Sequence, residues 1–197
     1  MLQKRIRLIA GLGNPGDAYQ KTRHNTGFMV IEEVATTFAI SLARQKFKTR
    51  YGAGSLKGID VILAKPMSFM NHSGPPVKRL ADYFRIKSED ILVIHDDIDL
   101  AFGKLKIKDK GGHAGHKGVK SLMEAFGKGD FVRLRIGVGR STEGIRVSDY
   151  VLGKFSSEEK KILAEIIATA RDAAVTIICE GVKEGMNRFN STRILNP

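Results

Sequence analysis

Short apolar runs of strand character alternate along this chain with longer stretches whose apolar residues recur at helical spacing. The runs are residues 6–9, 59–64, 91–94 and 131–138, and the helical stretches are residues 27–38, 77–84 and 156–177. Such alternation packs helices against the faces of a sheet. We therefore expect an α/β fold, a sandwich of helices around a mixed, mostly parallel twisted sheet, formed as a single domain over residues 1–197.

The last helical stretch has a distinct beginning and end. Ser156 is followed three residues later by Glu159, which is the pattern of a capping box. Gly181 follows the apolar stripe and is predicted to end the helix. A short basic tail remains, and we expect its last few residues to be flexible.

Composition limits the class of protein. The chain holds 33 Lys and Arg against 21 Asp and Glu, and this net charge of +12 favours an acidic partner, with nucleic acid ahead of a membrane surface. Its single cysteine excludes an internal disulfide and fits a reducing compartment. No apolar run approaches the roughly 20 residues that span a bilayer, and the N-terminal run is too short for a signal peptide. We expect a cytoplasmic protein with no membrane partner.

The positive charge is concentrated in residues 101–140, which hold ten basic and three acidic residues. In an extended chain, basic residues at every second position share one face. Two stripes have this period, namely Arg44, Lys46, Lys48 and Arg50, and Lys104, Lys106, Lys108 and Lys110. A single stripe is typical of a protected edge strand, but two of them, together with Arg133 and Arg135, favour a track for nucleic-acid phosphates.

A glycine-rich segment at residues 11–16 follows the first strand and matches the G-x-G-x-x-G pattern of dinucleotide-binding proteins. In those proteins a helix follows at once and meets the pyrophosphate. Here the next residues lack an apolar stripe, and the first convincing helix begins more than ten residues later. A sharp turn is the simpler interpretation, and another is a turn that presents the amide of Asn14 to an active centre.

Polar residues follow several apolar elements: Asn14, His24, Asn71 and Asp96. Ligands of open α/β sheets gather at the carboxyl ends of the strands, so these side chains could meet there. A neutral imidazole takes a proton from water near pH 7, a carboxylate fixes its tautomer, and amides donate to an oxyanion. Such a set would hydrolyse an ester without a covalent intermediate. The alternatives are a surface histidine, a solvated turn and a helix cap.

Two further chemistries are open to the residues alone. A metal-dependent hydrolase is one alternative, with ligands drawn from His95, Asp96, Asp97, Asp99, His113 and His116. The second histidine pair lies in a glycine-rich segment that ends in Lys117, which suits a flexible binding loop better than metal ligation. A covalent mechanism has little support, because Cys179 falls inside a helical stripe and no G-x-S-x-G motif occurs.

Taken in order, these motifs closely resemble those of bacterial peptidyl-tRNA hydrolases. The matching positions are residues 11–16, Tyr19, and residues 22–27, 65–66, 69–71, 95–100, 111–118 and 133–137. They run in the family's order across nearly the whole chain, and the ordered set is highly specific.

The resemblance implies hydrolysis of the ester between tRNA and a peptide or another N-blocked aminoacyl group, which recycles tRNA from stalled translation. It also implies a single α/β domain that is usually monomeric, has tRNA as its partner and no obligate protein partner, and uses no metal or cofactor. A non-catalytic tRNA-binding module and a metal-dependent hydrolase remain the alternative functions.

The same resemblance implies roles for single residues. His24 is the general base, and Asp96 tunes and orients it. Asn14 discriminates between blocked and free aminoacyl-tRNA, and Asn71 binds the substrate and the attacking water or oxyanion.

The remaining implied contacts concern binding. Tyr19 and Phe69 match positions that contact the tRNA end or the peptide, and Lys108 and Arg135 match a pair that grips a tRNA phosphate. His116 and Lys117 are expected to contact the substrate from the glycine-rich segment. Lys117 departs from the family, which commonly has Asn there, so the usual carboxamide is missing and a lysine would meet a phosphate or a peptide oxygen instead.

Overall fold

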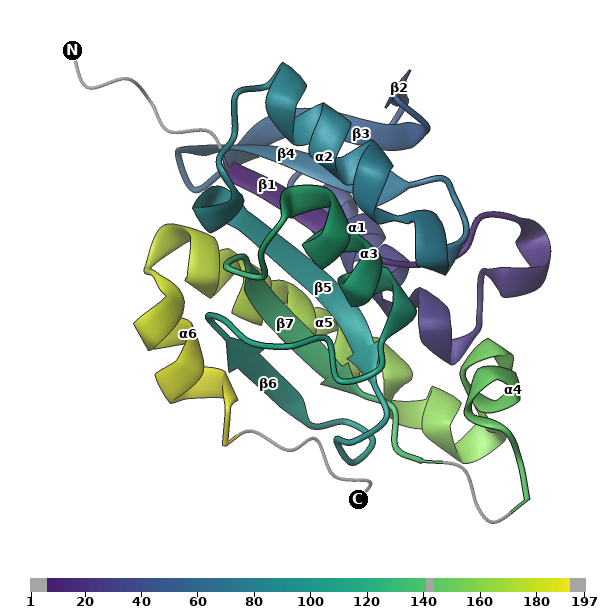
Figure 1. Ribbon diagram of the computed structural model, residues 1–197. Coiled ribbons are helices and arrows are strands. Elements are labelled where there is room, and N and C mark those ends of the chain that lie inside the picture. The colour runs from purple at the N-terminus through teal and green to yellow at the C-terminus, as the bar shows by residue number, and fades with distance from the viewer. Residues whose placement is uncertain (1–6, 141–143, 192–197) are drawn as a thin grey trace.

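The computed structural model describes residues 7–140 and 144–191 (Figure 1). Seven strands of this part of the chain form one sheet in the order β2-β3-β4-β1-β5-β7-β6. The four strands β4, β1, β5 and β7 run parallel, whereas β3 pairs antiparallel with β2 and β4, and β6 pairs antiparallel with β7. The predicted α/β fold with a mixed, mostly parallel sheet is confirmed.

The strands are β1 Arg7–Gly11, β2 Arg44–Lys46, β3 Thr49–Leu56, β4 Ile59–Pro66, β5 Ile91–Asp97, β6 Leu105–Lys108 and β7 Val132–Gly137. The α-helices are α1 Thr26–Thr37, α2 Gly74–Tyr83, α3 Lys117–Phe126, α4 Val147–Leu152, α5 Ser157–Cys179 and α6 Val182–Phe189. Short 3-10 helices occur at η1 Asp17–Tyr19, η2 Arg23–Asn25, η3 Met70–His72 and η4 Ser88–Asp90. None of the helices within the described ranges has the length and apolar character needed to cross a membrane.

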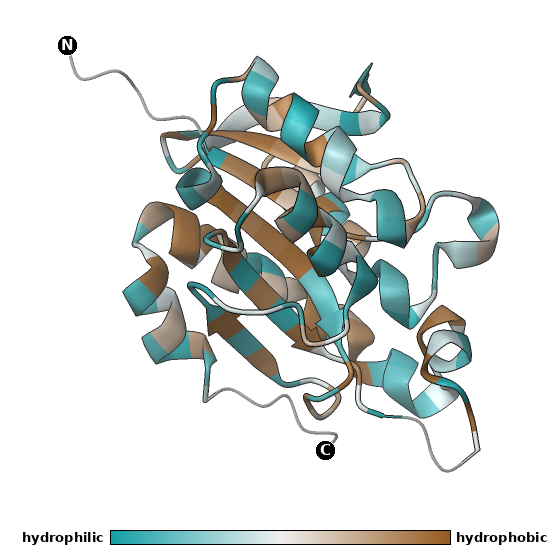
Figure 2. Cartoon of the chain, in the orientation of Figure 1, coloured by the Kyte–Doolittle hydropathy of each residue, from teal (hydrophilic) through white to brown (hydrophobic). Residues whose placement is uncertain are grey.

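Helices cover both faces of the sheet. On one face α1, α5 and α6 pack against alternate residues of the strands, and on the other face α2 and α3 do so. Figure 2 shows the central strands as mostly hydrophobic, as expected for strands buried on both faces. The C-terminal end of β5 is the exception, because polar residues lie there at the centre of the sheet.

Two strands run further than the sequence predicts. β4 continues through Lys65 and Pro66, which were expected to end it. β5 continues through His95, Asp96 and Asp97, all buried, which were expected to follow the strand. Pairing with β7 extends this strand, and side-chain partners satisfy the carboxylates of Asp96 and Asp97, so burial does not end at the last apolar residue.

The two basic stripes are less regular than expected. A hairpin turn at Phe47 and Lys48, both with positive φ, separates β2 from β3, so Arg50 is not on the same strand as Arg44. Because β6 is only four residues long, Lys104 and Lys110 lie outside it. The prediction that the basic residues of 44–50 and of 104–110 each lie on one face was therefore wrong, since it required one continuous strand for each segment.

The end of the chain was predicted in part. Ser156 caps α5 and forms the expected capping box with Glu159. Gly181, with φ 102°, follows the end of α5 and at once caps α6, a helix that the sequence did not predict. The tail expected to be flexible falls mostly at residues 192–197, which lie outside the described residues.

Candidate active site

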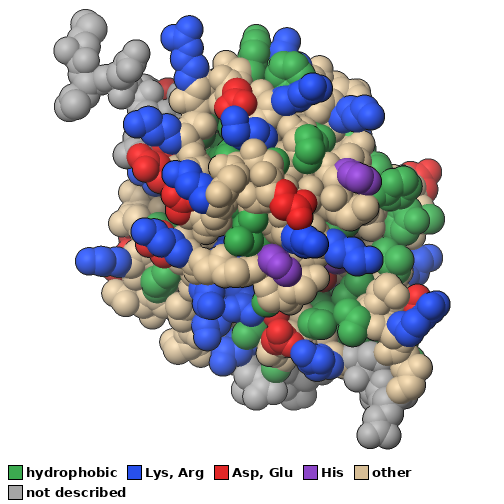
Figure 3. All heavy atoms as spheres, viewed as in Figure 1, with side chains coloured by type: hydrophobic (Ala, Val, Ile, Leu, Met, Phe, Trp, Pro, Cys, Tyr) green, Lys and Arg blue, Asp and Glu red, His purple; other side chains and the backbone are tan. Residues whose placement is uncertain are grey.

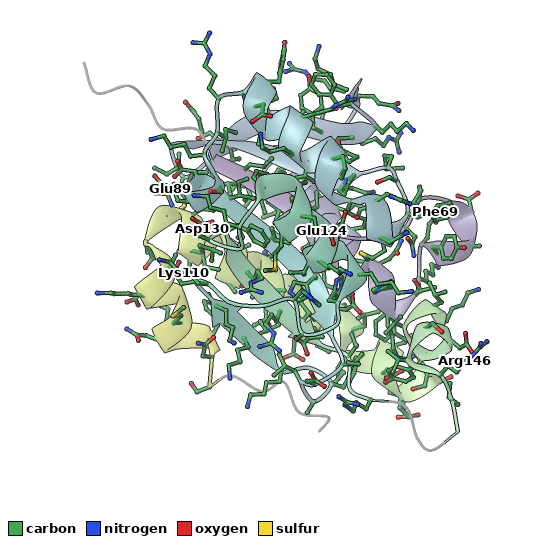
Figure 4. All side chains as sticks on the ribbon, in the orientation of Figure 1. Phe69, Glu89, Lys110, Glu124, Asp130 and Arg146 are labelled. Carbon is green, nitrogen blue, oxygen red and sulfur yellow. The ribbon has the colours of Figure 1, made fainter. Side chains whose placement is uncertain are left out.

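A cavity of about 680 Å³ opens at the carboxyl ends of β1, β4 and β5. Eight of the ten predicted site residues line it: Asn14, Tyr19, His24, Phe69, Asn71, Asp96, His116 and Lys117. Part of its wall is apolar and comes from α4, where Val147, Val151 and Leu152 line the cavity. Figure 4 shows Phe69 and Arg146, at the start of α4, on the same side of the molecule. The sequence did not indicate α4, because six residues are too few to show helical periodicity.

Glycines bring the start of α1 against the sheet and thereby place His24. A Cβ on Gly27 would lie 2.4 Å from the carbonyl oxygen of Ile94, and one on Gly11 would lie 2.2 Å from the carbonyl oxygen of Gly27. Only glycine allows this approach, so the helix begins directly on the backbone of β1 and β5. The glycine-rich segment thus serves close packing, and a 3-10 turn follows it instead of the helix that a dinucleotide site requires.

Arg23 fixes the loop on the other side of His24. Its buried guanidinium donates to the carbonyl oxygen of Lys154 at 2.8 Å, pairs with Glu159 at 2.6 Å and lies over the ring of Tyr150 at 4.3 Å. Sequence reasoning missed this role, since the partners lie more than a hundred residues away in the chain. The residue before the imidazole is therefore anchored to α4 and α5.

His24, Asp96 and His116 form a hydrogen-bonded row at the cavity. His24 Nδ1 lies 2.8 Å from Asp96 Oδ1 and 3.0 Å from Oδ2, and His116 Nε2 lies 3.0 Å from Oδ1. The carboxylate side chain is 2% exposed, while those of His24 and His116 are 12% and 9% exposed. A buried carboxylate thus orients two imidazoles at the wall of the cavity.

The tautomer of His116 follows from its second role, the N-cap of α3. Its Nδ1 accepts hydrogen bonds from the backbone N–H groups of Gly118 and Val119 at 3.1 and 3.2 Å. The proton of the neutral ring is therefore on Nε2, which donates to Asp96.

The same bonds set the state of His24. Burial opposes ionisation of Asp96, but the interactions with His24 and His116 outweigh it and hold the pKa of Asp96 well below its usual range. The ionised carboxylate accepts the Nδ1 proton of His24, which leaves His24 Nε2 free to accept a proton.

The three side chains also form a candidate metal site, with one ligand atom from each within 4.8 Å of the others. A metal on His116 Nε2 would require the ring proton to move to Nδ1, where the N–H groups of Gly118 and Val119 already point. The cap of α3 therefore opposes metal ligation by His116. The row fits a hydrogen-bonded acid–base system better than a metal centre.

The other residues considered as metal ligands do not converge. His95 Nδ1 lies 2.6 Å from a backbone carbonyl oxygen, and burial lowers the pKa of this ring. Asp97 and Asp99 are ion-paired with Arg135 and Arg140, respectively. No group of three ligands other than the histidine–aspartate row occurs in residues 7–140 and 144–191.

Asn14 is held in the turn after β1. Its backbone N–H donates to Asn25 Oδ1, and Asn25 Nδ2 donates to the carbonyl oxygen of Asn14, both at 2.9 Å. Asn14 Oδ1 accepts a hydrogen bond from the N–H of Met70 at 2.7 Å. With that oxygen occupied, Nδ2 is the group that Asn14 offers to the cavity. Asn71, exposed in η3, lines the same cavity.

Comparison with known proteins identifies the family. The family model for peptidyl-tRNA hydrolase matches residues 8–196. Peptidyl-tRNA hydrolases of Bacillus thuringiensis subsp. konkukian and Bacillus subtilis are 46% and 44% identical over 186 and 184 residues, which are 94% and 93% of this chain and 100% and 98% of those proteins. The crystal structure of peptidyl-tRNA hydrolase from Acinetobacter baumannii matches with a TM-score of 0.90 and 38% identity over 98% of each chain. The chain belongs to the peptidyl-tRNA hydrolase family.

The family predicted from the motifs is thus confirmed. Two of the site residues expected for a peptidyl-tRNA hydrolase, however, lie away from the cavity. Lys108 is exposed at the end of β6. Arg135 lies in β7 and pairs with Asp97, and their side chains are 14% and 6% exposed. The strand register places Lys108 opposite Arg133 and not opposite Arg135. The role of Lys108 and Arg135 as phosphate contacts stays a prediction.

Proposed function

We propose that this member of the peptidyl-tRNA hydrolase family hydrolyses the ester between tRNA and a peptide, with His24 as general base and Asp96 as its orienting partner. Family membership supports the reaction and the tRNA substrate. The 2.8 Å contact between His24 Nδ1 and Asp96 Oδ1, at the wall of the cavity, is the single observation that supports the roles of the two residues.

The first step is attack by water. His24 Nε2 accepts a proton from a water molecule, and the resulting hydroxide adds to the carbonyl carbon of the ester. Asp96 keeps the ring in the Nδ1–H tautomer and stabilises the imidazolium that forms. His116, whose own proton is fixed on Nε2, holds Asp96 in place.

The second step is collapse of the tetrahedral intermediate. Asn14 Nδ2, and the amide of Asn71, are the neutral donors that can stabilise the oxyanion. The C–O bond to the 3′ end of the tRNA then breaks, and the imidazolium of His24 returns the proton to the departing ribose oxygen. The products are the carboxylic acid of the peptide, which loses its proton to the solvent, and a tRNA with a free terminal hydroxyl.

Different parts of the cavity lining suit different parts of the substrate. The apolar wall with Phe69 and α4 suits the peptide, and Tyr19 suits the tRNA end. Lys117, exposed at the start of α3, suits a phosphate or a peptide oxygen. We further propose that the enzyme acts as a cytoplasmic monomer of one domain over residues 1–197, without a protein partner.

The direct test uses two substrates and a chelator. Purified protein is incubated with N-acetylated aminoacyl-tRNA and with the same aminoacyl-tRNA unblocked, and released tRNA is measured. We expect cleavage of the blocked substrate alone, undiminished by exhaustive chelation. Tight tRNA binding without cleavage would instead show a non-catalytic binding module, and loss of activity on chelation would show a metal-dependent hydrolase.

A further inference from the structure

His95 is a buried imidazole that the catalytic steps do not use. It precedes Asp96 in β5 and is 4% exposed. Its Nδ1 lies 2.6 Å from the main-chain carbonyl oxygen of Asp96, and because a carbonyl oxygen only accepts, the ring proton is on Nδ1. Nε2 is then a bare acceptor, and within the described residues it has no hydrogen-bond partner. A buried acceptor without a donor lowers stability, so stability alone does not favour an imidazole here.

His95 contacts both members of the hydrogen bond between His116 and Asp96. It donates to the main-chain carbonyl of Asp96, and its ring centroid lies 4.6 Å from that of His116 at an interplanar angle of 64°. This is the edge-to-face geometry that stabilises aromatic pairs. The ring of His116 also lies 5.1 Å from that of His24. His95 is thus connected to the general base through His116 and Asp96.

The three histidine rings converge because three segments of the chain meet at the carboxyl end of β5. His24 precedes α1 on one face of the sheet, whereas His95 shares the other face with Val93, which lies in the core under α2 and α3. Figure 1 shows the start of α3, where His116 is the N-cap, next to the carboxyl end of β5. Figure 3 shows histidines on the visible face only as separate side chains, in keeping with the burial of these three rings. The contact between His95 and His116 therefore lies inside the protein, where close packing defines the position of a ring.

His95 stays neutral in this environment. The titratable and charged groups that face its ring are Asp96 on its own strand, His116 at the start of α3, and Arg135, its partner in the register of β7. Burial, and then the imidazole of His116, lower the pKa of His95 well below its usual value. The charge of Arg135 is itself paired with Asp97. A neutral His95 adds no charge to the catalytic row, so its influence is exerted through geometry.

We propose that His95 is a positioning residue whose ring holds His116 at the angle from which His116 donates to Asp96. This inference rests on the proposed hydrolysis of peptidyl-tRNA and adds one residue to it. A second donor to a carboxylate lowers the proton affinity of that carboxylate. The bond from His116 therefore limits how strongly Asp96 stabilises the imidazolium of His24, and keeps His24 in the neutral form that accepts a proton from water. When the ring of His116 tilts away from Asp96, His24 should hold its proton up to a higher pH.

The test compares His95→Leu with the wild type on N-acetylated aminoacyl-tRNA over a series of pH values. In both proteins kcat/KM should rise with pH as His24 loses its proton. The midpoint of this rise should lie about half a pH unit higher in His95→Leu, which corresponds to a roughly threefold higher proton affinity of His24. At the plateau kcat should fall about two- to tenfold, the effect of losing one aromatic contact that orients the row. Thermal unfolding checks that the variant folds.

Three further variants assign the effect to the ring. His95→Phe keeps an aromatic ring against His116 and should restore both the midpoint and kcat. His95→Asn keeps a donor for the carbonyl of Asp96 but has no ring, so it should behave like His95→Leu, and it takes the place of that variant if leucine prevents folding. Val93→Ala removes buried volume from the same face of β5, and it should lower the unfolding temperature while keeping the wild-type midpoint.

A double-mutant cycle shows whether His95 acts through His116. In the background of His116→Ala, the further change His95→Leu should alter neither the midpoint nor kcat, because the ring that His95 positions is already lost. Equal shifts in the two backgrounds would mean that His95 acts on its own, and would overturn the inference.

The outcomes separate this inference from the proposed function. An active wild type whose midpoint is unchanged in His95→Leu, recovery in His95→Asn in place of His95→Phe, or a shifted midpoint in Val93→Ala would overturn the role of His95 alone. A wild-type protein that cleaves no N-acetylated aminoacyl-tRNA would refute the proposed function itself.

Discussion

At the carboxyl end of β5, His24, Asp96 and His116 satisfy one another, while on the adjoining face of β6 and β7, Lys108 and Arg133 have no carboxylate partner in the described structure. The first region is complete before any substrate arrives. The second region is electrostatically incomplete, and a polyanion would complete it. Under the proposed function the chemistry is therefore preorganised, whereas the substrate itself would stabilise the binding surface.

Removal of the imidazole should have the largest effect. His24→Ala should lower kcat by about 10²- to 10⁴-fold, because it removes the general base, and leave tRNA affinity unchanged. Cleavage rates and filter binding measure the two quantities. Full activity in the folded variant would refute the catalytic role of His24.

Asp96→Asn should lower kcat by about a hundredfold, since an amide no longer fixes the tautomer of His24 or stabilises its cation. The same variant should change how the free energy of unfolding depends on pH in the acid range. Because the pKa of Asp96 is lower in the folded protein than in the unfolded chain, the unfolded state gains its proton first as the pH falls.

The contribution of the Asp96 carboxylate to the free energy of unfolding is therefore present above about pH 4 and lost on acidification. In Asp96→Asn the free energy of unfolding should change less with pH below that value. Urea unfolding at a series of pH values measures this difference. Parallel profiles would show that the ionised carboxylate is not stabilised by its two imidazoles.

His116→Ala should lower kcat about tenfold and the free energy of unfolding by about 1 kcal/mol, because it removes both the donor to Asp96 and the cap of α3. His116→Asn is the matched variant, since Asn is a good N-cap residue. It should recover stability and not rate. Recovery of both would reduce the role of His116 to capping.

Charge reversal at Lys108 should have a smaller effect, and on binding only. Lys108→Glu should weaken tRNA binding and lower the salt slope of log K by about one phosphate contact, roughly 0.7 to 0.9. Titrations at several salt concentrations measure the slope. The same slope as wild type would place the phosphate contact elsewhere.

The substitution Lys117→Asn should have the smallest effect, a change in KM of less than about threefold, because Lys117 is exposed at the helix start and its contact with the substrate is weakly desolvated. A large loss of kcat would give Lys117 a part in the chemistry.

The sequence predicted the fold class and the family because apolar periodicity and ordered motifs are local properties of the chain. It also predicted the residues that converge at the cavity, since the carboxyl ends of parallel strands share one edge. It did not predict the anchoring role of Arg23, because that role depends on contacts with partners far away in the chain. The dual role of His116 was equally hidden, because a cap is visible only when the helix boundary is known.

The central claim is that catalysis and binding reside in separate regions, and one paired experiment tests it. Single-turnover cleavage rates and tRNA dissociation constants are measured side by side for Asp96→Asn and Lys108→Glu. The account predicts that Asp96→Asn lowers the cleavage rate at unchanged affinity, and that Lys108→Glu lowers affinity at an unchanged saturating cleavage rate. If both variants changed both quantities, the separation of the two regions would be contradicted.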